Sequence, residues 1–236
     1  MTSVVALIDC RLGIEMAKWL DSRGELAGVV VHPDQNRNQI SDQEIEGLSA
    51  WNAVWPDGLD QARALQPDYL LSVQFGYRIP REWLDVARLW PLNVHPGYLP
   101  DNRGRAPSAW PILNGSKAGV TLHVMNEGLD EGPWIIREEA PVYLDDTGDS
   151  LADRVEAVAF SMLKREWPTL GSRALNEQSD EGTYHSLQEI LGVVLSPSEW
   201  ITIDKLRARM YHGHGMVAER DGHRYEVRVE IERVDG

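Results

Sequence analysis

Val4-Val-Ala-Leu-Ile8 is an apolar run rich in β-branched residues, and Leu26-Ala-Gly-Val-Val-Val31 repeats the pattern. Runs of this length and composition predict strands that are buried on both faces of a sheet. Between them, Ile14 to Leu20 places apolar side chains at helical spacing, and Arg23-Gly24 closes the segment. A helix that connects two buried strands predicts a parallel pair. This stretch therefore indicates an α/β protein with a Rossmann-like, mostly parallel sheet.

The same patterns continue along the chain. Apolar or alternating runs predict further strands over Tyr69–Val73, Leu89–Val94, Gly119–Met125 and Trp134–Glu139. Helices are expected over Ser41–Trp51, Asp60–Leu65 and Thr147–Trp167. Ser41 with Glu44 three residues later predicts a capping box, and Thr147 is a suitable N-cap.

The character of the sequence changes near Gly171. A polar stretch leads to Gly182, a short helix is expected over Ile203–Met210, and two further runs flank Asp221-Gly222, which is a strong hairpin signal. We therefore expect a catalytic domain over residues 1–175 and a small C-terminal α+β extension with a β-hairpin over residues 176–236. The unpaired edge of that hairpin predicts a homodimer.

The bulk composition narrows the class of protein. The chain has 236 residues, of which 42% are hydrophobic and 25% charged, as in globular domains that bury a core. No apolar run approaches the ~20 residues of a membrane helix, and the N-terminus lacks the features of a signal peptide. The single cysteine, Cys10, excludes an internal disulfide and favours the cytoplasm.

Charge and motifs disfavour several kinds of ligand. The net charge of −14 argues against a large nucleic-acid surface, because phosphate backbones would be repelled. Neither a dinucleotide-binding glycine motif nor a phosphate-binding P-loop motif occurs in the sequence. His212-Gly-His214 provides two metal-ligating side chains without a third, so we expect no metal site.

Asn93 and His95 stand at i and i+2 at the end of an expected strand, so their side chains point to the same side. In parallel sheets, ligands bind at the carboxyl ends of strands. Asp130 belongs to a glycine-bounded acidic loop, Asn126-Glu-Gly-Leu-Asp-Glu-Gly-Pro133, that is suited to reach the same place. His123, on the strand before this loop, is expected to face away from the site.

These three residue types suit acyl transfer to an amine. Asn93 would stabilise the oxyanion of the tetrahedral intermediate, and His95 would act as electrophile and handle the amine proton. Asp130 would hold the imidazole and pass protons through a water. The alternative is that Asn93 and His95 cap a turn and that Asp130 is an ordinary loop acid. Spacing alone does not decide between the two.

At these residues the sequence resembles the folate-dependent formyltransferase family, most closely the nucleotide-sugar N-formyltransferases. The resemblance covers roughly Leu70 to Leu170. It rests on Asn93-Val-His-Pro-Gly-Tyr-Leu-Pro-Asp-Asn-Arg-Gly-Arg-Ala-Pro107 and Gly119-Val-Thr-Leu-His-Val-Met-Asn-Glu-Gly-Leu-Asp-Glu-Gly-Pro133. It implies the formyltransferase fold, a catalytic triad of Asn93, His95 and Asp130, and 10-formyltetrahydrofolate as co-substrate. Gly97 stands where many members have serine, and this form resembles the branch that formylates nucleotide-linked amino sugars.

The resemblance also implies where the co-substrate binds. In such enzymes the pterin lies against a loop after a preceding strand, and the matching segment here is Gln74-Phe-Gly-Tyr-Arg-Ile-Pro80. The cofactor-binding candidates are Phe75, Tyr77, Arg78 and Ile79, chiefly through their backbones, and Asn126, Glu127 and Leu129 of the acidic loop.

The resemblance leaves the formyl acceptor open. It favours a nucleotide-linked amino sugar of the dTDP-amino-dideoxysugar type, with Arg103, Arg105, Tyr184 and Arg207 as substrate-binding candidates. Methionyl-tRNA is disfavoured because those enzymes carry a basic C-terminal domain. Glycinamide ribonucleotide is disfavoured because the turn Asp9-Cys-Arg-Leu-Gly13 has a single glycine. N-hydroxyornithine, used in siderophore assembly, is the main alternative acceptor, and a non-catalytic binding module is the third hypothesis.

Overall fold

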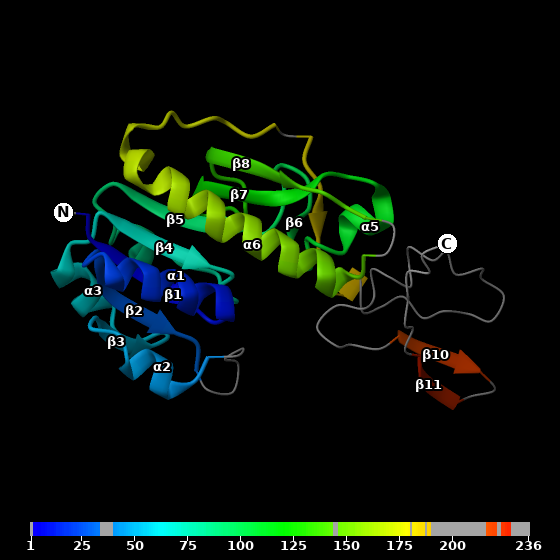
Figure 1. Ribbon diagram of the computed structural model, residues 1–236, viewed down its shortest axis with the longest axis horizontal. Helices are drawn as coiled ribbons and strands as arrows, with labels where there is room; N and C mark the ends of the chain where they lie inside the picture. The colour runs from blue at the N-terminus through cyan, green and yellow to red at the C-terminus, as the bar shows by residue number, and fades with distance from the viewer. Residues whose placement is uncertain are drawn as a thin grey trace, which may run out of the picture. The chain divides into compact units, whose positions relative to one another are not determined.

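The computed structural model describes residues 2–33, 40–143, 146–179, 181–186, 188–189, 216–220 and 223–227. The main element of the protein is a seven-stranded sheet with the order β3-β2-β1-β4-β5-β7-β8 (Figure 1). The strands β1 (Val4–Ile8), β2 (Leu26–Val31), β3 (Trp51–Val54), β4 (Tyr69–Val73) and β5 (Trp90–His95) pair in parallel. β7 (Ala118–Val124) runs antiparallel to β5, and β8 (Trp134–Ala140) lies next to β7. The predicted mostly parallel α/β sheet is confirmed.

The chain divides into two compact units that interleave along the sequence. The first unit comprises Met1–His95, Thr121–Ile136 and Phe160–Gln178. The second comprises Pro96–Val120, Arg137–Ala159 and Ser179–Gly236. The domain boundary expected between residues 175 and 176 stays a prediction.

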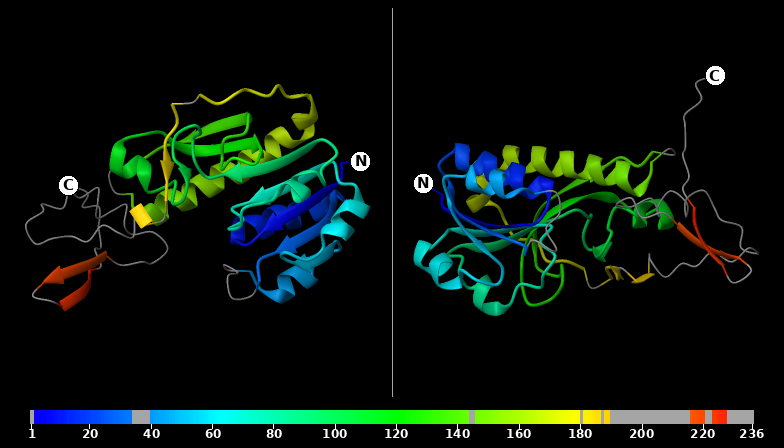
Figure 2. Two further views of the ribbon diagram at one scale, coloured as in Figure 1. Left: turned by 180° about the vertical axis from the view of Figure 1, so that it is seen from behind. Right: turned by 90° about the horizontal axis from the view of Figure 1, so that it is seen from below.

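The parallel strands of the first unit are covered on both faces. α1 (Arg11–Ser22) lies against one face, and α3 (Leu59–Leu65) and α4 (Arg81–Leu84) lie against the other (Figure 2). On the second face, Val5 and Leu7 form a core cluster with Ala62 of α3 and Trp83 of α4. Every residue of β1 and β4 is buried, which explains why β1 is entirely apolar and why Ser72 is the one small polar residue within β4.

The segment expected as one helix over Ser41–Trp51 contains a helix and the start of a strand. α2 (Asp42–Glu46) begins at the expected capping box, in which the Glu44 N–H donates to Ser41 Oγ and the Ser41 N–H donates to the Glu44 carboxylate. Gly47 ends the helix, and β3 begins at Trp51. The prediction is wrong beyond Glu46 because Gly47, which is a poor helix former, interrupts an otherwise periodic apolar pattern. The short helices α4 and α5 (Trp110–Asn114) are not predicted either.

The later elements follow the expected order. α6 (Gly148–Glu166) confirms the longest predicted helix, and the Ser150 N–H donates to Thr147 Oγ1 at 3.1 Å as an N-cap bond. A 3-10 turn, η2 (Trp167–Ser172), follows it. β10 (Met216–Arg220) and β11 (His223–Val227) form the expected antiparallel hairpin. Its turn and the helix expected over Ile203–Met210 lie outside the described residues, and the homodimer stays a prediction.

A buried carboxylate anchors the start of α6. Asp146 is 3% exposed and accepts two hydrogen bonds of 2.7 Å from the Arg154 guanidinium. It also accepts from the Tyr143 N–H at 2.7 Å and the Ser150 hydroxyl at 2.8 Å. Burial raises the pKa of Asp146, but the hydrogen bonds outweigh burial and hold that pKa below its ordinary value of 3.8. The charged carboxylate of Asp146 therefore stabilises the fold at pH values above 3.8.

We expect Asp146→Asn to lower the free energy of unfolding by about 2 kcal/mol at neutral pH, because Arg154 loses its charged acceptor. The difference from the unchanged protein should narrow as the pH falls from 3.8 through the lower pKa of the folded state, because Asp146 binds a proton more readily in the unfolded chain. Urea unfolding across this pH range measures both effects. Asp153→Asn, at an exposed position of α6, is the control and should be neutral. An equal loss in both variants would contradict this account.

Candidate active site

The antiparallel pair of β5 and β7 holds two of the predicted catalytic residues. In this pair Asn93 lies opposite His123, and His95 lies opposite Thr121. Asn93 and His95 are two residues apart on one strand, so their side chains emerge on the same face, as the sequence predicts. Asn93 is half-buried, and His95 is only 4% exposed.

Asp130 reaches these side chains from the loop between β7 and β8. The amide Nδ2 of Asn93 donates to Asp130 Oδ1 at 3.4 Å, and His95 Nδ1 lies 3.5 Å from Asp130 Oδ2. Asp130 is 9% exposed and has a left-handed backbone φ of 55°. The first unit thus brings the three predicted residues together, while their catalytic roles stay a prediction.

His123 joins this group, contrary to the expectation that it faces away from the site. Its Nε2 lies 3.1 Å from Asn93 Nδ2 and 3.7 Å from Asp130 Oδ1. The amide nitrogen of Asn93 can only donate, so Nε2 must accept, and the ring proton is then on Nδ1. That nitrogen lies 3.2 Å from the Val124 carbonyl oxygen, which accepts it. His123 therefore orients the Asn93 amide. The strand pattern could not reveal this, because the register of β7 against β5 decides which side chain lies beside Asn93.

The predicted co-substrate loop, residues 74–80, is fixed by packing. Phe75 and Ile79 pack against the core cluster of the first unit. The rings of Phe75 and Tyr77 contact the buried imidazole of His32, with centroid distances of 4.7 and 4.3 Å. The Gly76 N–H donates to His32 Nε2 at 3.0 Å. The two aromatic side chains thus serve packing, which leaves the backbone of the loop as the candidate contact for a pterin.

The two segments predicted to bind the co-substrate meet at Arg78. Its Nη2 donates to the Glu127 carbonyl oxygen at 2.5 Å. Asn126, Glu127 and Leu129 are exposed on the loop that carries Asp130. Asn126 Oδ1 accepts from the Gly128 N–H at 3.0 Å, which shapes this part of the loop as an Asx-turn. Binding by these residues stays a prediction.

Three of the four predicted substrate-binding residues lie in the described part of the second unit. β6 (Arg103–Gly104) pairs in parallel with β9 (Tyr184–His185), and Arg103 lies opposite Tyr184. The Tyr184 ring is largely free of packing, since the residue is 56% exposed, and Arg105 is exposed as well. Arg207 lies outside the described residues.

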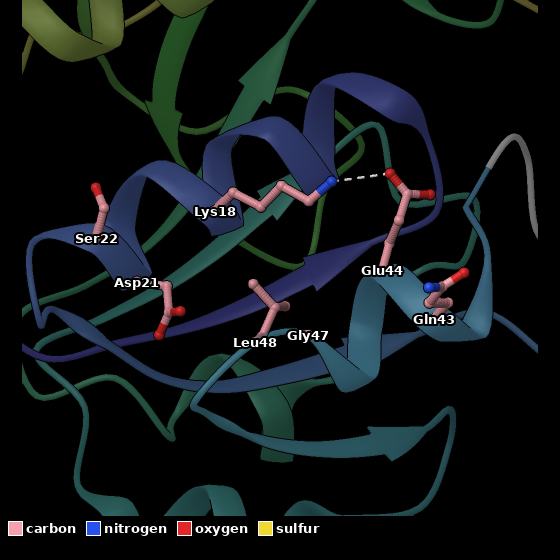
Figure 3. A pocket seen from close by; sticks show the side chains of 7 residues that line it. All are labelled: Lys18, Asp21, Ser22, Gln43, Glu44, Gly47 and Leu48. Atoms are coloured by element: carbon pink, nitrogen blue, oxygen red, sulfur yellow. Dashed lines mark hydrogen bonds and ion pairs between the residues drawn. The ribbon is translucent and has the colours of Figure 1, made fainter.

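A surface hollow next to α1 and α2 belongs to a different part of the first unit (Figure 3). It is lined by Lys18, Asp21, Ser22, Gln43, Glu44, Gly47 and Leu48. The ammonium of Lys18 lies 2.8 Å from the Glu44 carboxylate, and this bond, together with the hydrogen bonds to Ser41, lowers the pKa of Glu44 to about 2. None of the predicted site residues lines this hollow, and we assign it no ligand.

No group of three His, Cys, Asp or Glu side chains in the described ranges is arranged to hold a metal ion, and His212 and His214 lie outside them. Among the helices of the described residues, none is long and apolar enough to cross a membrane.

Comparison with known proteins classifies the chain. A family model described as formyl transferase matches residues 28–166, which is more than half of the chain. A methionyl-tRNA formyltransferase of Synechococcus elongatus is 32% identical over an alignment of 180 residues, which covers 69% of this chain and 55% of that protein. The chain spans about half the length of the curated relatives it matches.

Solved structures share the fold. A sugar N-formyltransferase from Shewanella superposes with a TM-score of 0.83 at 20% identity, with 100% of both chains covered. An N-formyltransferase from Helicobacter canadensis, solved with folinic acid and dTDP-3-aminofucose, superposes with a TM-score of 0.74 at 16% identity. That match covers 94% of this chain and 85% of the other. At these identities the likeness shows the fold alone, whereas the family match is decisive: the chain belongs to the formyl transferase family.

Proposed function

We propose that this chain is an N-formyltransferase that moves a formyl group from 10-formyltetrahydrofolate to the amine of a nucleotide-linked amino sugar. The observation that carries the proposal is the approach of both Asn93 and His95 to the Asp130 carboxylate, at 3.4 and 3.5 Å. An amide donor, an imidazole and a carboxylate together meet the needs of acyl transfer to an amine without a covalent enzyme intermediate.

The reaction forms one bond and breaks another. The acceptor amine attacks the formyl carbon, and the formyl oxygen takes the negative charge of the tetrahedral intermediate. Collapse of this intermediate breaks the bond between the carbon and N10 of the folate, and the proton lost by the amine finally reaches N10. The site must therefore supply a donor to the oxyanion and a carrier for one proton.

The contacts of Asn93 suit the role of oxyanion donor. His123 holds its amide through the shorter contact of 3.1 Å, whereas the contact with Asp130 is longer, at 3.4 Å. We expect the longer contact to be exchanged for the formyl oxygen when the donor binds. His95 carries the proton, and the carboxylate of Asp130 next to its Nδ1 stabilises the imidazolium while the proton is held.

Two observations support a nucleotide-linked amino sugar as the acceptor. Sugar N-formyltransferases are among the proteins with the same fold, and one N-formyltransferase was solved with dTDP-3-aminofucose. In the second unit, exposed Tyr184 opposite Arg103 offers an aromatic face and a cation, which suit a nucleotide base and a diphosphate.

Methionyl-tRNA is the second candidate acceptor, because curated relatives at 32% identity carry that name. The net charge of −14 weighs against it, since an acidic protein repels the phosphate backbone of RNA.

Substitution of the triad tests the mechanism. Asn93→Ala should lower kcat/KM by about 10²- to 10³-fold through loss of the oxyanion donor, and His95→Ala and Asp130→Ala should each lower it by at least about 10²-fold. The exposed residues Asn52 and Asp57 provide matched controls, and their alanine variants should keep full activity. Formyl transfer followed by mass spectrometry, with thermal melting to verify folding, makes the measurement. Full activity of folded His95→Ala would refute the mechanism.

A panel of amines identifies the acceptor. We expect the protein, incubated with 10-formyltetrahydrofolate, to formylate a dTDP-linked amino-dideoxysugar and to leave methionyl-tRNA and N-hydroxyornithine unchanged. The mass gain of each acceptor reports the result. Formylation of methionyl-tRNA or N-hydroxyornithine, with every amino sugar unreacted, would overturn the proposed acceptor and leave the proposed reaction type intact.

A further inference from the structure

The loop that carries Asp130 needs support from outside itself. Asp130 has a left-handed backbone with a φ of 55°, a conformation that is uncommon for residues other than glycine. Its neighbours Glu127, Leu129 and Glu131 are exposed, so packing of the loop's own side chains contributes little. The loop nevertheless holds the Asp130 carboxylate against Asn93 and His95, so other contacts must fix its backbone.

A segment far along the chain provides such contacts. The side-chain amide of Gln178 donates to the Asp130 carbonyl oxygen at 2.8 Å and to the Gly132 carbonyl oxygen at 2.6 Å. Two residues earlier, Asn176 forms an antiparallel bridge with Trp134, with backbone hydrogen bonds of 2.8 and 2.9 Å. Residues 176–178, which we call the strap, thus run along the end of the loop and the start of β8, where they bind backbone atoms of Asp130, Gly132 and Trp134.

The opposite side of this loop is held by β7. The Val124 N–H donates to the Pro133 carbonyl oxygen at 2.9 Å. Gly132 is pressed so closely against β7 that a Cβ at this position would lie 1.8 Å from the Val124 carbonyl oxygen. The backbone from Asp130 to Pro133 is therefore held between β7 and the strap. A change in the strap should move the Asp130 carboxylate before it disturbs the sheet.

We propose that Gln178 is a positioning residue for formyl transfer, which it serves by fixing the peptide backbone of Asp130. This inference rests on the proposed function of the triad. A primary amide suits the task because its two N–H groups satisfy two carbonyl oxygens at once. It is also neutral. A lysine here would place a positive charge near Asp130 and would alter the charge balance between that carboxylate and His95.

The test is the near-isosteric variant Gln178→Glu, in which an acceptor replaces the donor and faces two carbonyl oxygens. We expect kcat to fall by about 10- to 100-fold, since a small misplacement of a catalytic group has effects of this size. The KM for 10-formyltetrahydrofolate should change by less than about threefold, because Gln178 acts on Asp130 and only indirectly on the donor. Gln61→Glu, which adds the same charge at an exposed position of α3, is the matched control and should leave both constants unchanged.

A double-mutant cycle separates positioning from general structural damage. If Gln178 acts through Asp130, Gln178→Glu should have little further effect on the residual single-turnover rate of Asp130→Ala. The inference is wrong if Gln178→Glu retains the original kcat. It is also wrong if it slows Asp130→Ala by the same factor as the unchanged protein.

Amide hydrogen exchange tests the role of Gln178 without requiring that the acceptor amine be known. In the unliganded Gln178→Glu protein, amide exchange over residues 126–133 should accelerate, while exchange in β1 and β4 should match the unchanged protein. If the unchanged protein formylates no amine, the proposed function fails, and exchange alone decides whether Gln178 holds the loop. Unchanged exchange over residues 126–133 would overturn the inference whatever the activity.

Discussion

The antiparallel pairing of β5 with β7 is the constraint on which the candidate active site depends. The parallel strands β1 to β5 deliver Asn93 and His95 to the edge where ligands of such sheets bind. Because β7 runs back along β5, His123 comes to lie beside Asn93, and the chain that leaves β7 returns as the loop with Asp130. A register shift of one residue would turn His123 to the other face and would remove the nearer of the two acceptors of the Asn93 amide.

Much of this framework can be read from local sequence. Strands buried on both faces appear as largely apolar runs, so Val4–Ile8 and Tyr69–Val73 are predicted with their observed bounds. The strand β3 is missed because it follows a helical pattern and is only four residues long. The placement of Asn93 and His95 on one face of a strand follows from strand periodicity. The approach of Asp130 depends instead on the path of a loop, which no periodicity describes.

His32 and Gln178 are missed by sequence reasoning because their roles arise from contacts between segments that are distant in the sequence. Gln74 and Asp130 both have left-handed backbones, with φ of 50° and 55°, at the loops assigned to co-substrate and catalysis. Each loop is held by a side chain distant in sequence, His32 for one and Gln178 for the other. Neither residue belongs to a recognisable motif. Their importance becomes visible only when the backbone atoms that they bind are placed beside them.

The candidate catalytic and acceptor-binding residues belong to different units of the chain. The first unit contains the triad, His123, the strap and the co-substrate loop, whereas the second unit contains Arg103, Arg105 and Tyr184. The proposed formyl transfer thus depends on residues of the strand pair and its loop. The proposed acceptor rests on only a few side chains in the second unit. For this reason the sequence predicts the reaction more firmly than the substrate.

The most direct test of the central claim is a crystal structure of this protein with a stable 10-formyl analogue of folate. The account predicts that the pterin lies against residues 74–80 and that the formyl oxygen is within hydrogen-bonding distance of the Asn93 amide, with His95 beside it. A formyl group that points away from Asn93, or an analogue bound elsewhere on the protein, would contradict it.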